Sequence, residues 1–470
     1  MTNPSASNRV SGHATVEEEK AAREEIASKF IDALRPQLPA LLQSLAKIQD
    51  YRNPKKIEHQ LTMVLLYGIL CFVFQTSSRR EANRELSGPM LLEHLRRLFP
   101  EMDKIPHQDT LHRLLCGIDV EAIQQTHLEM IRRLIRNKKF HRWLIAGCYP
   151  VAIDGTQKVV RRDQLSPEWL QRRINAGQDG ESTQYYVYVL EAHLAFHNGL
   201  TLPLMSEFLN YAEGDTDTDK QDCETKAFHR LARRLKTAFP RLPLMLLLDG
   251  LYPNGPVLKT CRDHRWQFMI VLKDDSLKSV WEEYEGLRKL EPDHQVQRNW
   301  GHRRQTFRWV NHIEYRYGTN QRKKQVVHLV VCEECWEEID AEANPVKKSS
   351  RHAWLSSEPL TKGNLHERCN LGARHRWGIE EALLVEKRHG YQYEHLFSFN
   401  WNAMKGYHYL MHLGHALNAL AQYSEHLYEI VVSKGVRAFL RYVRESLLHP
   451  WLDPDRLYAR LRPDPQLRLT

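Results

Sequence analysis

Apolar side chains recur every three or four residues from Thr15 to about Trp143, which is the spacing of one helix face. Thr15 precedes three glutamates, a pattern typical of a capped helix start. Four segments carry the clearest pattern: KFIDALRPQLPALLQSLAKI, LTMVLLYGILCFVFQ, PMLLEHLRRLF and DTLHRLLCGI. We therefore expect a helical N-terminal region over 15–147. Residues 1–14 are small and polar without periodicity, and we expect them to be disordered.

Two neighbouring segments of this region leave two interpretations open. One starts at Pro89 and the other at Asp109, and their polar faces carry Arg96, Arg97 and Arg113. Two short basic helices joined by a loop fit a helix-turn-helix that sits on DNA. They fit a plain helical bundle with a basic surface equally well.

The pattern changes to that of β-strands at Cys148. YPVAIDG indicates a short buried strand that ends at Asp154, and a polar loop follows over 161–182. YYVYVLEAHLAF and LTLPLMSEFL predict a hairpin that turns at Asn198–Gly199. After a helix from Asp219 to Phe239, the apolar run PLMLLLDGLY is typical of a central strand, and it ends at Asp249. With a further helix and strand, residues 148–272 form an α/β unit.

An insertion is expected at 273–354. It opens with a charged helix and continues as a long hairpin, in which RRQTFRWVNHIEYRYG and VVHLVVCEECW alternate on either side of a polar turn. Helical patterns return over 355–425, where the second part of the α/β core is expected. The tail, 426–470, is helical and basic, and it is suited to dimerisation, to DNA contact or to capping the core.

Composition favours a polyanionic partner. The formal net charge is +9 and the sequence pI is about 9.0. Eight scattered cysteines form no disulfide framework, so we expect a reducing cytoplasm. We expect no signal peptide and no membrane span, because the N-terminus lacks an apolar stretch and the most apolar run, Leu61 to Gln75, is short.

The candidate chemistry centres on the stretch from Arg374 to His395. Read as one helix, it places Arg376, Glu380 and Lys387 on the same face. Such a face is either a solvated surface with an Arg–Glu pair or a carboxylate that holds a metal ion beside a phosphate. Asp154 and Asp249, each closing an apolar strand, favour the second interpretation, because three carboxylates suit hard divalent cations.

These motifs resemble those of DDE transposases from bacterial insertion sequences, in particular the group marked by Y-x2-R-x3-E-x6-K. VAIDG and LLLDGLY are similar to the two aspartate motifs of that family, and Arg376, Glu380 and Lys387 match R-x3-E-x6-K in spacing. Ala373 stands where the signature has its tyrosine. The similarity covers roughly residues 148–415.

The resemblance implies an α/β fold with a ribonuclease H-like core, interrupted by a β-rich insertion and flanked by helical regions. It implies that Asp154, Asp249 and Glu380 are catalytic and bind two Mg²⁺ ions, with Mn²⁺ as a substitute. The implied reaction is cleavage at transposon ends and strand transfer into target DNA. Implied partners are inverted-repeat ends, target DNA and a second copy of the chain, in the bacterial nucleoid. Two alternatives stay open: a nuclease that never joins strands, and a transposase-derived DNA-binding protein.

Five further residues are expected to contact DNA. Arg376 and Lys387 would bind phosphates near the scissile bond. The resemblance places the insertion on the transposon end, where Trp300 is a candidate for stacking on an unpaired base, flanked by Arg303 and Arg304. Trp309 is a weaker candidate, because aromatic pairing across the hairpin explains it as well.

Three weaker signals accompany these motifs. Cys332 and Cys335 form a lone C-x2-C without a second half, which is poor support for zinc. The histidines at 408, 412 and 415 share one helix face, which suits a metal site but fits packing or a subunit interface better. Glu381 and Glu386 lie off the Arg376–Lys387 face, so we expect both to tolerate substitution.

Overall fold

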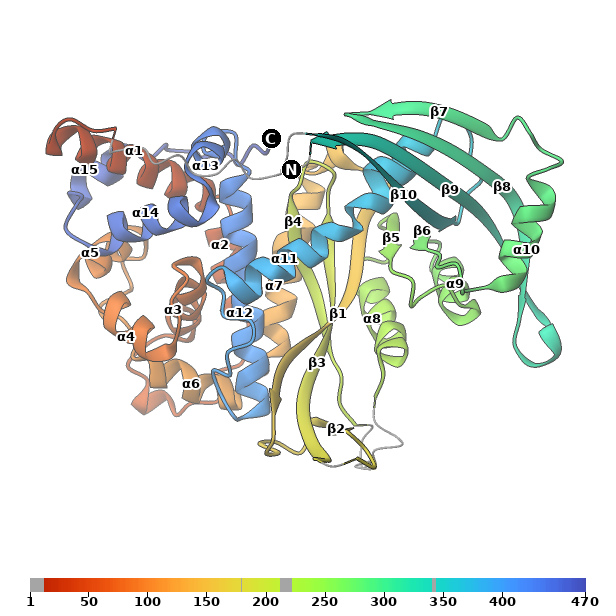
Figure 1. The fold of residues 1–470 in the computed structure, drawn as a ribbon. Coiled ribbons are helices and arrows are strands. Elements are labelled where there is room, and N and C mark those ends of the chain that lie inside the picture. Colours follow the sequence, from red (N-terminus) through yellow and green to blue (C-terminus); the bar gives the residue numbers. More distant parts are fainter. Residues whose placement is uncertain (1–11, 179, 212–221, 340–343) are drawn as a thin grey trace.

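A mixed sheet of ten strands runs through the molecule, and helices from both ends of the chain gather beside it (Figure 1). The computed structural model describes residues 12–178, 180–211, 222–339 and 344–470. The expectation of disorder for 1–14 thus falls largely outside the described residues. The strands are β1 (Tyr149–Arg161), β2 (Leu170–Ile174), β3 (Ser182–Ala195), β4 (Thr201–Phe208), β5 (Leu244–Leu248), β6 (Gln267–Val271), β7 (Gln295–Trp300), β8 (Arg303–Tyr317), β9 (Lys323–Ile339) and β10 (Pro345–Ser356).

Helices occupy most of the rest. They are α1 (Val16–Leu34), α2 (Leu38–Leu45), α3 (Leu61–Val73), α4 (Arg79–Leu86), α5 (Pro89–Leu98), α6 (Gln108–Gly117), α7 (Glu121–Arg136), α8 (Glu224–Ala238), α9 (Gly255–Asp263), α10 (Lys278–Leu287), α11 (Trp377–Arg388), α12 (Trp401–Gln422), α13 (Tyr428–Lys434), α14 (Val436–Leu448) and α15 (Pro454–Ala459). Short 3₁₀ turns lie at Pro54–Lys56, His141–Trp143 and Thr319–Gln321. Among the described residues, no helix is long and apolar enough to cross a membrane.

The strand order places β1 near the middle of the core. β2 and β4 both pair with β3, and from β3 the order runs β1, β5, β6, β10, β9, β8, β7. β1, β5 and β6 are parallel to one another, whereas every other pairing is antiparallel. The near-continuous apolar sequence of β5 fits this position, because all five of its residues are buried.

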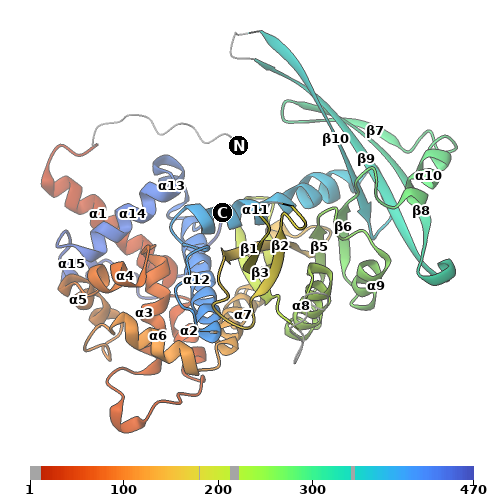
Figure 2. The same cartoon turned by 60° about the horizontal axis from the view of Figure 1, so that its bottom comes forward.

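The hairpin expected in the insertion is present as β8 and β9, but the insertion is not a separate β layer. β10 pairs with β6 through Trp354 and Val271, so the inserted strands extend the core sheet itself. Figure 2 shows β8, β9 and β10 projecting beyond the helices, and we call β7 to β10 the β-arm.

The first strand differs from its expected length. The sequence predicted an end at Asp154, yet β1 continues to Arg161 because β3 pairs with it along that whole stretch. β2 also lies inside the expected loop, 161–182, where it pairs with the first part of β3. Asp154 is therefore an internal strand residue.

One bundle unites the two ends of the chain around α12. Most of α12 is buried, and it packs against α1, α3, α6 and α7 as well as β4. α14 packs on α1 and α5, while α15 packs on the same two helices. The two helices that suggested a helix-turn-helix are α5 and α6. Each packs on its own set of neighbours, with α6 against α3, α4 and α12, so their setting favours the helical-bundle interpretation.

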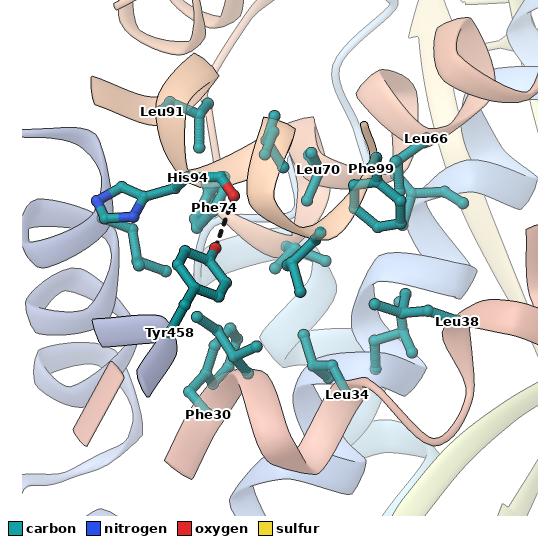
Figure 3. A pocket seen from close by; sticks show the side chains of 17 residues that line it. Phe30, Leu34, Leu38, Leu66, Leu70, Phe74, Leu91, His94, Phe99 and Tyr458 are labelled. Carbon is teal, nitrogen blue, oxygen red and sulfur yellow. Dashed lines mark hydrogen bonds between the residues drawn. The ribbon is translucent and has the colours of Figure 1, made fainter. Parts of the chain in front are cut away.

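An apolar cavity of about 60 Å³ lies inside this bundle (Figure 3). His94 and Tyr458 line it, and the Tyr458 hydroxyl donates a hydrogen bond of 2.7 Å to the backbone carbonyl of His94. Burial among these side chains lowers the pKa of the His94 imidazole to about 4. His94 is therefore a neutral histidine in an apolar setting.

The stretch expected as one helix from Arg374 to His395 is built in pieces. A π-helical turn, His366–Gly372, leads into a 3₁₀ turn, Ala373–Arg376, and α11 begins at Trp377. α11 ends at Arg388, followed closely by Gly390 with a φ of +102°. The helix lies across the sheet between the bundle and the β-arm (Figure 1). Its buried residues are Ile379, Ala382, Leu383 and Glu386.

Candidate active site

The two aspartates come from neighbouring parallel strands. The β1–β5 pairing ends at Ala152 and Leu247, and Asp154 and Asp249 each lie two residues further along. Because the two strands run parallel, both aspartates lie beyond the same end of the β1–β5 pairing, and their carboxylates approach the same region. Their charges are coupled, since the negative charge of Asp249 raises the pKa of Asp154.

Glu380 reaches the same region from the first turn of α11. Arg376 precedes the helix, is 6 % exposed, and donates a hydrogen bond of 2.6 Å to Glu380. Burial raises the pKa of Asp154 to about 6. The positive charge of Arg376 opposes this shift, and the negative charges of Glu380 and Asp249 add to it. The pKa of Asp154 therefore depends on the charges of both other acids of the expected triad.

The three acids do not form a closed ligand shell. Among the described residues, the one group of three or more ligating side chains with its atoms within 4.8 Å of one another is Glu191, His193 and His412. One oxygen of Glu380 is occupied by Arg376, and one oxygen of Asp249 accepts the backbone N–H of Leu251 at 2.9 Å. The three acids thus lie in the same region without closely surrounding one common position.

A fourth carboxylate, Glu224, stands beside the triad and was missed by sequence reasoning. It begins α8 and accepts hydrogen bonds from the hydroxyls of Tyr188, at 3.0 Å, and Tyr252, at 2.6 Å. Its charge also raises the pKa of Asp154. The fold packs it tightly against β1, because a Cβ at Gly155 would lie 2.6 Å from Glu224 and 2.5 Å from the Tyr188 hydroxyl.

The donor set suits hard divalent cations. Asp154, Asp249, Glu380 and Glu224 supply only carboxylate oxygens, which Mg²⁺ prefers over nitrogen or sulfur ligands. Burial is the main cause of the raised pKa of Asp154, and the charges of Glu380, Asp249 and Glu224 raise it further while Arg376 opposes them. A bound dication would supply the missing positive charge.

Lys387 lies two turns after Glu380 in α11 and pairs with a different carboxylate. Its ammonium lies 3.4 Å from Glu394 and 5.8 Å from the centre of the Tyr393 ring. The cause is the early end of α11, after which the chain turns and brings 393 and 394 back beside the last helical turn. Of the two expected cations, Arg376 contacts the glutamate and Lys387 is held elsewhere.

The β-arm contacts the turn before α11 through one arginine that lies over two aromatic rings. The Arg374 guanidinium lies 4.8 Å from the Trp300 ring and 5.6 Å from the Trp354 ring. Trp300 therefore contacts Arg374, and in the preceding helix Trp281 and Tyr284 pack on each other. Trp309 is buried and stacks on His294, so it is closed to a DNA base.

The two expected DNA-contacting arginines of the β-arm differ in their setting. Arg303 is tied to the buried Glu334 at 3.0 Å, and it stacks on Trp336. Arg304 is exposed, with one hydrogen bond of 2.7 Å to Gln297. Arg304 is thus the more accessible of the two to a phosphate.

Glu334 is the charged centre of this junction. Burial alone would raise its pKa, but hydrogen bonds from His352 and Gln305 and the charge of Arg374 hold the pKa well below its usual range. Arg303 and Arg374 both form ion pairs with it. Glu334 therefore joins β9 to the turn that precedes α11.

The structure places each of the weaker signals in its surroundings. Cys332 is buried and Cys335 is exposed, because residues three apart in a strand point to opposite faces, so they do not form a zinc pair. The three histidines of α12 are buried within the chain instead of at a subunit interface. Glu386 is 0 % exposed and lies 2.6 Å from His415, which contradicts the expectation that it tolerates substitution. Glu381 is exposed, as that expectation requires.

Comparison with known proteins matches the helical part of the chain. A family described as DDE_Tnp_1-associated matches residues 42–131, which extend from α2 into α7. None of the curated proteins compared with the chain matches it. The family match points to a DDE-type transposase and to a transposase-related function, with DNA as partner. The four carboxylates lie outside residues 42–131, so their assignment depends on the structure and not on the family match.

Proposed function

We propose that this protein is a DDE transposase that cuts DNA at transposon ends and joins the freed ends to target DNA. The observation that carries the proposal is the electrostatic coupling of Asp154 to Asp249, Glu380 and Arg376, in a chain whose N-terminal helices match a transposase-associated family. A scaffold has no need for several acids around one buried carboxylate, since their repulsion is destabilising.

The strand order supports a ribonuclease H-like core. β4, β3 and β1 are antiparallel neighbours, and β5 and β6 continue from β1 in parallel. This arrangement puts Asp154 and Asp249 on adjacent strands and lets α11 bring Glu380 across the sheet. The long separation between the second aspartate and the glutamate is filled by the β-arm, which interrupts the core.

Asp154, Asp249 and Glu380 would hold two Mg²⁺ ions, with Glu224 supporting the group from α8. When bound, a pair of divalent ions activates a nucleophile and stabilises the leaving oxygen of a phosphodiester. The chain must keep Asp154 deprotonated, orient Glu380 through Arg376, and offer the remaining N–H groups of Arg376 to a phosphate.

Two in-line displacements follow from this arrangement. In the first, water attacks the phosphorus at the transposon end, the P–O3′ bond breaks, and a 3′-hydroxyl is released on the transposon. In the second, that 3′-hydroxyl attacks a target phosphorus. A new P–O bond forms as the target P–O3′ bond breaks, and the target strand leaves with a free 3′-hydroxyl.

The test uses the full chain, DNA carrying the inverted repeats that flank its gene, and Mg²⁺. We expect end cleavage followed by joining to a supercoiled plasmid. Asp154→Asn, Asp249→Asn and Glu380→Gln should each abolish both products, while Glu381→Gln, the neighbouring exposed acid, should retain most activity. Activity that survives Asp154→Asn and Glu380→Gln would overturn the proposal.

The same assay separates the alternatives. A nuclease cleaves end DNA but yields no joined product when offered its own 3′-hydroxyl ends. A DNA-binding derivative retards end DNA without cleaving it in either Mg²⁺ or Mn²⁺. The coupling of Asp154 to its neighbouring acids favours an enzyme over a DNA-binding derivative, and the joined product distinguishes a transposase from a nuclease.

A further inference from the structure

A second group of ligating side chains is buried beside the candidate active site. Glu191 and His193 come from β3, Glu386 from α11 and His412 from α12. Each of the four is at most 4 % exposed. Glu191 lies directly opposite Asp154 in the β1–β3 pairing, so this group, which we call the Glu–His cluster, begins one strand away from the candidate active site.

The cluster contains polar atoms without partners. Within the described part of the chain, one carboxylate oxygen of Glu191, one of Glu386, Nε2 of His412 and both ring nitrogens of His193 have no hydrogen-bond partner. Buried polar atoms are normally paired, because leaving them unpaired forfeits their hydration. Five unpaired atoms in one cluster therefore call for a common ligand.

The spacing of these atoms fits a metal ion better than direct contact. One ligand atom from each of Glu191, His193 and His412 lies within 4.8 Å of the others. His412 Nε2 is 4.0 Å from the unpaired oxygen of Glu191 and 3.6 Å from the oxygen of Glu386 that His415 contacts, and both distances are too long for hydrogen bonds. A tetrahedral zinc ion with bonds of about 2.0–2.1 Å holds its ligand atoms about 3.4 Å apart, so a small contraction closes the site.

We propose that Glu191, His193 and His412 bind one structural Zn²⁺ ion, with Glu386 beside the site. Two imidazoles and a carboxylate are a typical zinc set, whereas Mg²⁺ prefers oxygen alone. The three ligands are buried, as the ligands of a structural site are. They come from β3 and α12, and Glu386 places α11, the helix that carries Glu380, next to the ion.

Neighbouring side chains already orient both carboxylates of the cluster. The Tyr393 hydroxyl donates to the other oxygen of Glu191 at 2.8 Å, and His415 Nδ1 lies 2.6 Å from the other oxygen of Glu386. Such outer hydrogen bonds hold metal ligands in place. They leave one oxygen of Glu191 unpaired, which an ion can use.

The competing explanation is a proton in place of the metal. Burial alone lowers the pKa of His412, but the charges of Glu386 and Glu191 raise it, so a protonated His412 balances part of their charge. That arrangement leaves both ring nitrogens of His193 unpaired, whereas a zinc ion uses one of them.

The test measures zinc in full-length protein that has been treated with chelator, incubated with Zn²⁺ and passed through gel filtration. An Asp154→Asn/Asp249→Asn background removes aspartate ligands from the candidate active site. We expect one zinc per chain, and at least tenfold less after His193→Ala or Glu191→Gln. His94→Ala is the matched control, because His94 is also buried with both ring nitrogens unpaired but lies in the apolar cavity.

A second readout covers variants that fold poorly. Co²⁺ bound to the parent should show the visible absorption of a tetrahedral nitrogen–oxygen site, and Zn²⁺ should raise its melting temperature. Glu191→Gln, nearly equal in shape, should lose both effects. The proposal is overturned if the parent retains no zinc, or if His193→Ala and Glu191→Gln retain as much as the parent. The parent is catalytically inactive, so neither outcome depends on transposition.

Discussion

At the scale of single residues, Asp154 carries the clearest electrostatic signature. Its pKa of about 6 lies above the ordinary value near 3.8, so the folded protein binds its proton more tightly than the unfolded chain does. The folded state is therefore favoured by this group at low pH, and that advantage is lost as pH rises from about 4 to about 6. Above that range the ionised Asp154 destabilises the fold.

This sign gives a testable outcome for Asp154→Asn without divalent metal. At pH 7.5 the variant should be more stable than the wild type by about 1–3 kcal/mol, since one pKa unit corresponds to about 1.4 kcal/mol. Near pH 4 the two proteins should unfold alike. Urea unfolding at both pH values checks this, and equal stability at pH 7.5 would contradict the assignment.

End cleavage by the wild type should also fall as pH drops below about 6, because a protonated Asp154 is a poor metal ligand.

Glu386 and Glu381 differ in burial although they are close in sequence. Glu386→Gln removes a buried charge that pairs with His412 and His415, so we expect a loss of about 3–5 kcal/mol in unfolding free energy. Glu381→Gln, at an exposed position, should change it by less than about 0.5 kcal/mol. Thermal melts of the two variants make the comparison, and equal melts would show that the Glu–His cluster adds nothing to stability.

Lys387 tests whether a cation on α11 reaches DNA. It pairs with Glu394 in the free protein, so a phosphate must compete with that carboxylate. If it does, Lys387→Ala should make the salt dependence of end binding shallower by about one unit of slope. Glu394→Ala frees Lys387 and should leave the slope unchanged or steeper. An unaltered slope in Lys387→Ala would mean that the lysine is structural.

At the scale of elements, the sequence indicated most strands and helices but not their ends or partners. The hairpin of β8 and β9 follows from local alternation and β5 from its continuous apolar run, and both patterns are encoded residue by residue. The extension of β1 depends on pairing with β3, and the early end of α11 depends on a turn at Gly390, so both rest on contacts beyond local periodicity. Glu224 was missed for the same reason, since only the fold brings α8 beside β1.

The junction between the β-arm and α11 depends on Glu334. Glu334→Gln would leave Arg303 and Arg374 without their shared counter-charge in a largely buried setting. We expect a loss of about 3–5 kcal/mol in unfolding free energy, the usual scale for breaking a buried pair. Glu333→Gln is the matched control, because Glu333 pairs with Arg308 nearer the surface. Calorimetry of both variants would contradict this role if their melting temperatures fell equally.

At the scale of the whole molecule, the N-terminal helices and the central sheet are not independent. α12 follows α11 in sequence, yet α3, α6 and α7 cover much of its surface. A fragment that starts at residue 148 would expose that apolar surface to water. We expect it to aggregate when produced alone and to become soluble when residues 1–147 are supplied in trans. A soluble, cooperatively folding fragment would show instead that the sheet stands alone.

The continuity of the β-arm with the core sheet restricts how its length can change during evolution. Side chains alternate between two faces along a strand, so removing one residue from β8 or β9 would turn every later side chain over. Phe307 would then leave the buried face of β8, while Arg304 would turn towards it. Related chains should therefore lengthen or shorten this arm in matched steps of two residues per strand, or confine odd changes to its turns and bulges. The number of residues in each strand of the β-arm would therefore take only every second value within such a family.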